Sequence, residues 1–306
     1  MRHTKRKGEI DVGKKLSPAF YKLTSNEPHN LETYNLINKP IEIYAFIDPF
    51  CPNSWSLEGY LKKLIVEYGS YFKLRAITSG NLYSINPKVP KRSQSEKRKN
   101  TDKFSVKSND SEANDQISSM WEALLALKAA ELQGRRVGLR FLRKMQEYYF
   151  LNKEDISNHD VLIEIAEGIK IDIAEFKKDL NSKVAKRALQ RDLNLAYEME
   201  IDVTPALVFF NLTDDEDGIK VAGLYDYEVY VDALFEVLKK KVKPAFKPAL
   251  IDFIAQFSFV ETNEVAVIYN WSVEQAEKEL KKLLIAQKVK HIRVNQGSFW
   301  EYISDR

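Results

Sequence analysis

Cysteine is almost absent from this chain. Cys51 is the only cysteine among 306 residues, so no disulfide can form within the chain and a secreted fold held together by disulfides is excluded. Histidine is scarce as well: the four histidines stand at positions 3, 29, 159 and 291, without the spacing of metal ligands. We therefore expect neither a metal site nor a cofactor.

Long apolar runs and a strong excess of one charge are also missing. No apolar stretch is long enough to span a bilayer, and residues 1–8 are charged and polar, without the apolar run of a secretory signal. We expect a cytoplasmic protein that does not bind membranes. The net charge of +3 is small for this length and argues against a surface built to grip nucleic acid. The length suggests two domains.

The segment Cys51-Pro52-Asn53-Ser54 is the most informative feature that is present. It follows an apolar run at 41–48 and precedes an amphipathic stretch from Trp55 to Tyr68, which predicts a strand, a cysteine at the junction and a helix. The positive end of a helix stabilises a thiolate, and the thioredoxin fold places its redox cysteines here. A dithiol enzyme needs a second thiol to complete its cycle, and Ser54 stands in its place.

The order of predicted elements is typical of a thioredoxin-like domain of the DsbA type. After the helix come a strand at 71–77, an all-helical block at 117–198, an apolar strand at 203–211 with a short hairpin partner, and a last helix. We therefore predict an α/β fold whose DsbA-like domain covers residues 40–241. The block at 117–198 is a helical insertion in this domain.

Three further segments are predicted to be an extension, a loop and a linker. Residues 1–39 carry dispersed charge and are predicted to be an N-terminal extension. The stretch 84–115 has no periodicity and holds eight basic residues between Lys88 and Lys107. It predicts a flexible basic loop, either simply solvated or a docking surface for an acidic partner. The proline-containing stretch 242–248 predicts a linker.

Residues 249–306 predict a second, smaller α+β domain. Three helices are expected, the second capped by Thr262 and the third opened by a capping box of Ser272 and Gln275, before a β-hairpin at 289–302. Three helices and a hairpin in this length are typical of a winged helix. The side chains that the third helix is expected to bury are Val273, Ala276, Leu280, Leu283 and Leu284.

The winged-helix pattern raises the question of nucleic-acid binding, which its charges oppose. Residues 249–306 hold seven lysines and arginines against eight acidic residues, whereas phosphate binding needs surplus positive charge. The third helix interleaves its glutamates and lysines at i,i+4 spacing, which is typical of a solvated face. Two interpretations stay open: a DNA-binding module and, as the favoured one, a module for protein interaction or structure.

Thr204-Pro205 opens the apolar strand that follows the helical block. Thioredoxin-like folds carry a cis-proline here, opposite the cysteine motif, where a backbone edge stays free to pair with an extended peptide. We therefore take Cys51, Ser54, Thr204 and Pro205 as a candidate thiol site, in which the Ser54 hydroxyl is placed to donate a hydrogen bond to a thiolate. Three interpretations of Cys51 stay open: an idle cysteine, a thiol that senses redox state or forms a mixed disulfide with a client, and an independent catalyst.

Several segments together resemble one known family, the Spx adaptor family of Gram-positive bacteria (SpxH, also called YjbH). The resemblance runs from about residue 40 to the end of the chain, and the combination of a DsbA-like domain with a winged-helix tail makes it specific. The segments that carry it are Ile47–Glu58, Tyr68–Gly69, Ala129–Gly134, Glu198–Ile201, Pro205–Phe210 and Gly223–Tyr225.

The resemblance implies a cytoplasmic adaptor and not an enzyme. Members of this family bind the transcriptional regulator Spx, promote its degradation by the ClpXP protease and are associated with thiol-oxidative stress. Some members have two cysteines in the motif, so Ser54 puts an intramolecular thiol switch in doubt here. Pro52, Asn53 and Trp55 are candidate client-binding residues. The alternative is a cytoplasmic monothiol oxidoreductase or isomerase of the DsbA-like kind, acting through Cys51.

Overall fold

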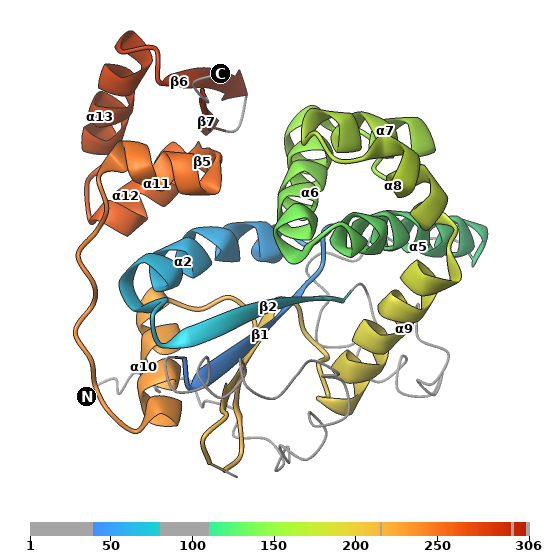
Figure 1. The fold of residues 1–306 in the computed structure, drawn as a ribbon, viewed down its shortest axis with the longest axis horizontal. Coiled ribbons are helices and arrows are strands. Elements are labelled where there is room, and N and C mark those ends of the chain that lie inside the picture. The colour runs from blue at the N-terminus through green and yellow to red at the C-terminus, as the bar shows by residue number, and fades with distance from the viewer. Residues whose placement is uncertain (1–38, 80–109, 215, 295–296, 304–306) are drawn as a thin grey trace, which may run out of the picture. The chain divides into compact units, whose positions relative to one another are not determined.

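A computed structural model describes residues 39–79, 110–214, 216–294 and 297–303. Residues 1–38 of the predicted extension and most of the predicted basic loop at 84–115 lie outside these residues. The chain forms two compact units (Figure 1). We call Met1–Ala45, Ser56–Arg75 and Ala206–Arg306 the sheet unit, and Phe46–Trp55 with Ala76–Pro205 the helical unit. These units do not coincide with the domain boundaries predicted from the sequence.

A four-stranded sheet has the order β2-β1-β3-β4. The central strand β1 is buried at every position, which explains its nearly continuous apolar sequence. The predicted hairpin is formed by β3 and β4, which pair antiparallel from Ala206 opposite Ala222 to Phe209 opposite Ile219. The strands are β1 Ile41–Ile47, β2 Phe72–Thr78, β3 Ala206–Asn211 and β4 Ile219–Ala222.

Helix α2 (Pro52–Tyr68) follows β1 in the chain, and helix α10 (Tyr227–Leu238) packs against β3 and β4. Helix α2 begins three residues earlier than the amphipathic pattern indicates, because a proline at the first helical position has the backbone angle of a helix and needs no hydrogen-bond donor there. Its apolar side is buried through Leu57, Leu61 and Leu64.

The helical unit is built around α5, which packs against α6, α8 and α9 (Figure 1). Helix α5 begins at Asp110, inside the stretch predicted to be a loop, so that prediction is wrong at 110–115. The first residues of α5 are polar, and periodicity therefore gives no signal there. The elements are α5 Asp110–Leu132, α6 Arg135–Glu147, the π-helix η2 Tyr148–Asn152, α7 His159–Gly168, α8 Ile173–Leu180 and α9 Lys183–Glu198.

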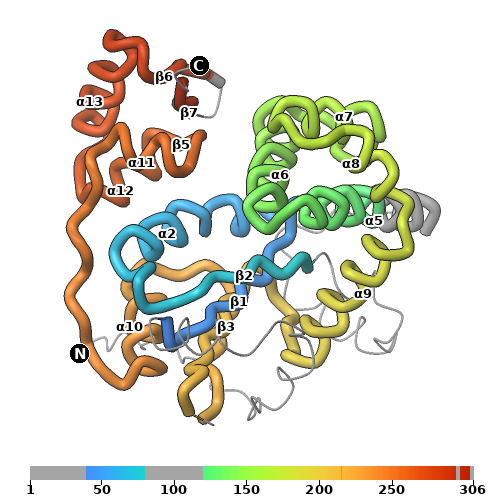
Figure 2. The backbone as a smooth tube through the Cα atoms, in the orientation of Figure 1, coloured from blue at the N-terminus to red at the C-terminus, as the bar shows by residue number. Residues whose placement is uncertain are grey.

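The C-terminal module, residues 249–303, contains the three helices and the hairpin predicted for a winged helix. A third strand, β5, was missed because it has only three residues, and it completes a sheet of order β5-β7-β6. The chain from α10 to this module is extended (Figure 2). The elements are α11 Leu250–Phe257, β5 Phe259–Glu261, α12 Thr262–Tyr269, α13 Val273–Ile285, β6 Val289–Val294 and β7 Gly297–Tyr302.

The cap of α12 and the burial of α13 differ in part from what the sequence predicted. The cap of α12 is Glu261, which forms a reciprocal capping box with Glu264, while the Thr262 hydroxyl donates to the Ser298 carbonyl at 3.1 Å. The third helix buries Ala276 and Leu280 as predicted. Val273, however, is 47% exposed, and Leu284 is exposed too.

Candidate functional site

Cys51 stands in a tight turn between β1 and α2. Its backbone N–H donates to the Asp48 carbonyl at 3.1 Å, and its own carbonyl accepts the N–H of Trp55 at 3.2 Å, the first hydrogen bond of the helix. The Asp48 carboxylate accepts the N–H of Phe50 at 2.9 Å. Aspartate commonly closes a turn in this way, so Asp48 shapes the loop that presents the thiol.

The thiol lies against the segment that opens β3. The Cys51 Sγ donates to the Thr204 carbonyl at 3.5 Å, across 153 positions of sequence. The Thr204–Pro205 peptide bond is cis. The structure therefore brings together Cys51, Thr204 and Pro205, three of the four residues predicted for the thiol site.

Ser54, the fourth of these residues, makes a different contact from the one expected. Its side chain is buried, and its Oγ accepts the backbone N–H of Asp48 at 3.3 Å. The sequence pattern indicated a hydrogen bond to the Cys51 thiolate, whereas the structure shows a bond to the turn. Pro52 and Asn53 are exposed beside the thiol, and Cys51 itself is half-buried.

Four partly buried aromatic rings, which we call the aromatic cluster, lie next to this turn: Phe50, Trp55, Tyr149 and Phe150. Ring centroids are 5.1 Å apart for Phe50 and Tyr149, 5.0 Å for Tyr149 and Phe150, and 5.7 Å for Trp55 and Phe150. Trp55 was predicted as a site residue, whereas Tyr149 and Phe150 were missed. The only local signal is three consecutive aromatic residues, which fall in the π-helix η2, and π-helical turns are frequent at functional sites.

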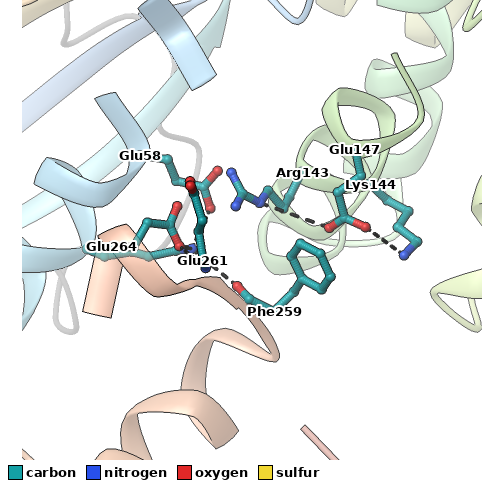
Figure 3. Close-up of polar contacts among 8 residues, drawn as sticks. Glu58, Arg143, Lys144, Glu147, Phe259, Glu261 and Glu264 are labelled. Carbon is teal, nitrogen blue, oxygen red and sulfur yellow. Dashed lines mark hydrogen bonds and ion pairs between the residues drawn. The ribbon is translucent and has the colours of Figure 1, made fainter. Parts of the chain in front are cut away.

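Arg143 on α6 holds the Trp55 ring in place. The guanidinium is buried and lies over the indole at 3.8 Å from its centroid, a geometry that contributes up to about 2 kcal/mol when desolvated. Glu147 pairs with Arg143 at 4.0 Å and with Lys144 at 2.6 Å, as the close-up of α6 shows (Figure 3). The Trp55 side chain is therefore fixed in place before a partner binds. Contact with a partner costs this side chain little conformational entropy.

Asp48 is an acidic residue of the site whose pKa is shifted from its ordinary value. Burial raises the pKa of its carboxyl from 3.8 to about 6, and the hydrogen bond from Phe50 opposes this rise. Because the folded protein holds this proton more tightly than the unfolded chain, stability is lost as the pH rises from about 4 through about 6. Above that pH window, the total loss in the free energy of unfolding is at most about 3 kcal/mol.

Asp48→Asn should therefore stabilise the protein in a pH-dependent way. Asparagine keeps the oxygen that accepts the Phe50 N–H but cannot ionise, so we expect the free energy of unfolding to rise by about 1–3 kcal/mol at pH 8 and far less at pH 4. Urea unfolding at both pH values measures this difference. An equal gain at both would contradict a role for Asp48 ionisation.

Two other kinds of site are not found among the residues that the structure describes. No group of three or more histidine, cysteine, aspartate or glutamate side chains is arranged to hold a metal ion in this part of the chain. Among the helices that the structure describes, none is both long and apolar enough to cross a membrane.

Residues 44–232 match the family model described as Thioredoxin. This match covers more than half of the chain and agrees with the strand order, the cysteine turn and the cis-proline described above. The chain is thus a thioredoxin-like protein, and the predicted fold class is confirmed.

Comparison with individual curated proteins shows which family within this class the chain belongs to. The ClpXP adapter protein SpxH of Bacillus subtilis is 46% identical over 270 residues, which cover 87% of this chain and 90% of that protein. SpxH of Bacillus licheniformis is 45% identical over 272 residues, with the same coverage. The chain belongs to the SpxH family of ClpXP adapter proteins, as the sequence resemblance predicted. Among solved structures, Pseudomonas aeruginosa DsbA2 has a TM-score of 0.44 at 13% identity, over 67% of this chain and 93% of that one.

Proposed function

We propose that this protein is an adaptor that binds a transcriptional regulator of the Spx type in the cytoplasm and promotes its degradation by the ClpXP protease, in the response to thiol stress. The name of its relatives, ClpXP adapter protein, supports the protease partner. The family resemblance of the sequence supports Spx as the client. The observation that carries a binding role is a single thiol beside a preorganised aromatic surface.

The chemistry of the cysteine turn favours binding over disulfide exchange. A catalytic cycle between dithiol and disulfide needs a second sulfur to release the mixed disulfide. The fourth motif position holds Ser54, whose oxygen bonds the backbone of the turn. What remains is a partly exposed thiol that contacts the Thr204 carbonyl and is bordered by the exposed Pro52 and Asn53.

The aromatic cluster is the proposed anchor for the client. Tyrosine and tryptophan dominate binding energy at interfaces when they are well packed and partly exposed. Exposed Pro52 and Asn53 border the cluster on the first turn of α2, and Trp55 lies on the same turn. By holding the regulator here, the adaptor raises its effective concentration at the protease without any covalent chemistry.

Trp55→Ala should weaken binding of the purified Spx-type regulator by at least about tenfold, because the indole is a rigid anchor. Isothermal titration calorimetry under reducing conditions measures the affinity, and a ClpXP degradation assay measures the consequence. Cys51→Ala should leave both nearly unchanged. Tyr197→Ala, which removes an exposed aromatic side chain of α9, is the matched control and should have no effect.

The rival function is monothiol oxidoreductase or isomerase activity. The contact between the Cys51 thiol and Thr204 favours it, since this is where a substrate disulfide would approach. An insulin-reduction assay decides between the two. Strong turnover by the wild type that Cys51→Ala abolishes, together with loss of regulator binding in the same variant, would overturn the adaptor proposal.

The charges of α13 support a protein-interaction role for the C-terminal module. Lys281 pairs with Glu277 at 2.8 Å and Lys282 with Glu279 at 2.7 Å. Each lysine of these pairs is already neutralised within the helix that would enter a DNA groove, whereas DNA binding depends on cations available to phosphates. We therefore propose no nucleic-acid partner.

A further inference from the structure

A groove lies in the sheet unit where α2 and α10 meet α12 and α13. It is a widely open groove with a volume of about 650 Å³. We call it the α10–α12 groove and define it by the residues that carry the argument, Tyr60, Asp226, Glu228, Val267, Trp271 and Val273.

The walls of this groove are held together by polar contacts. Lys62 of α2 is buried, and its ammonium pairs with Glu264 at 2.9 Å and donates to the Phe259 carbonyl at 3.3 Å. Its acidic neighbours Glu58 and Glu264 and the Phe259 carbonyl are drawn in Figure 3. Lys63 donates to Asn270 of α12 at 2.9 Å. Since these contacts fix α2 to the C-terminal module, the groove is preformed, and binding to it requires little reorganisation.

The groove exposes apolar side chains. Val273, which the sequence pattern assigned to the core, is 47% exposed, and Val267 is 36% exposed. The partly buried indole of Trp271 stacks on Tyr269 with centroids 4.6 Å apart. Apolar groups gathered in one concave site, bordered by polar ones, are characteristic of an interaction surface.

The groove also has a charge preference. Asp226 and Glu228, at the start of α10, are both exposed, and neither forms an ion pair with another described residue. Among the residues that line the groove, Lys63 is the one cation; it donates to the neutral amide of Asn270 and lies over the Tyr227 ring at 4.5 Å from its centroid. Its charge offsets one of the two carboxylates, so the lining keeps one negative charge. Carboxylates beside aromatic rings attract the cationic side chains of arginine and lysine. The complementary ligand is therefore basic.

We infer that the α10–α12 groove is a docking site for a segment of the client that places an arginine or lysine next to an apolar side chain. The inference rests on the proposed function, because it assumes that the protein captures a client. The apolar side chain would cover Val267 and Val273, and the cation would pair with Asp226 and Glu228. A second point of attachment makes capture stronger than either contact alone through effective concentration.

Short overlapping labelled peptides that span a purified Spx-type regulator test this inference by fluorescence anisotropy. Peptides with a basic residue beside an apolar one should bind the wild-type protein. Glu228→Lys and Val267→Asp should each weaken that binding by about tenfold. Glu236→Lys, which reverses an exposed charge farther along α10, and Val184→Asp, which alters an exposed valine of α9, are matched controls and should change it less than about twofold.

A charge-swapped peptide makes the test specific. Replacing its basic residue with glutamate should abolish binding to the wild type and restore it to Glu228→Lys. If no peptide distinguishes Glu228→Lys from Glu236→Lys, the inference is wrong. It is equally wrong if Val267→Asp changes the sedimentation of the protein alone and leaves peptide affinity intact, because the groove would then bind a second copy of the chain.

Degradation by ClpXP separates the inference from the proposed function. If the wild-type protein does not accelerate degradation of the regulator, the adaptor proposal fails. If it does, and Glu228→Lys and Val267→Asp act as well as their controls, the adaptor proposal stands and the groove is not a client site. The expected result is acceleration by the wild type and both controls, with a loss of about tenfold in client affinity for the two groove variants.

Discussion

Lys62→Met should lower the free energy of unfolding by about 3 kcal/mol, because removing one partner of a buried ion pair leaves the other charge uncompensated. Lys62 is only 3% exposed and joins α2 to the C-terminal module through Glu264. Glu264 is also buried, and besides this pair it accepts the backbone N–H of Glu261 at 3.0 Å. Its carboxylate therefore stays in a poorly solvated place when the ammonium is gone.

A double-mutant cycle isolates this pair. We expect Lys62→Met with Glu264→Leu to cost less than the sum of the single changes by about 1–3 kcal/mol, since the double variant no longer leaves the buried Glu264 carboxylate without its ammonium. Lys282→Met removes the cation of an exposed pair on α13 and should cost less than about 1 kcal/mol. Urea unfolding followed by circular dichroism measures all four variants. Additive costs would show that the contact contributes nothing as a pair.

Trp300→Ala should destabilise the C-terminal module by about 4 kcal/mol, through lost burial and the cavity that remains. Trp300 is fully buried in the core of this module and stands on β7, opposite Val260 of β5 and His291 of β6. Its indole N–H donates to the Thr262 hydroxyl at 2.9 Å, and its ring stacks on His291 with centroids 4.1 Å apart. One side chain thus joins all three strands and the first residue of α12.

Two comparisons separate the contributions to this effect. Trp300→Phe keeps most of the apolar bulk and loses the donor, so its cost should be about half that of alanine. Trp271→Ala removes a partly exposed indole and should cost about 1–2 kcal/mol. Differential scanning calorimetry follows the melting of the module in each variant. Equal losses for Trp300→Ala and Trp271→Ala would contradict the packing described here.

The local elements were predictable because their signals are local. The nearly continuous apolar runs of β1 and β3 and the 3.6-residue period of the apolar positions in α2 are visible in the sequence. The prediction failed where such a signal is weak. The three-residue strand β5 is too short to show a period, and the start of α5 is polar.

The candidate site was predictable in part. The junction position of Cys51 and the proline of Thr204-Pro205 indicated two segments that meet in thioredoxin-like folds, and the structure shows the contact. Tyr149 and Phe150 were not predictable, because they reach Phe50 and Trp55, respectively, through the packing of α6 and η2, which are far from these residues in the sequence. The exposure of Val273 was missed for a related reason: an amphipathic pattern shows which side of a helix is apolar but not whether a neighbour covers it.

The amino-acid composition and the local sequence were therefore enough to predict the class of fold and the family. They also showed that the chain has one thiol where a dithiol enzyme has two. Which side chains surround that thiol, and which apolar residues of α12 and α13 remain uncovered, depends on contacts between segments distant along the chain. Such contacts form only when helices and strands pack, and no local pattern encodes their partners.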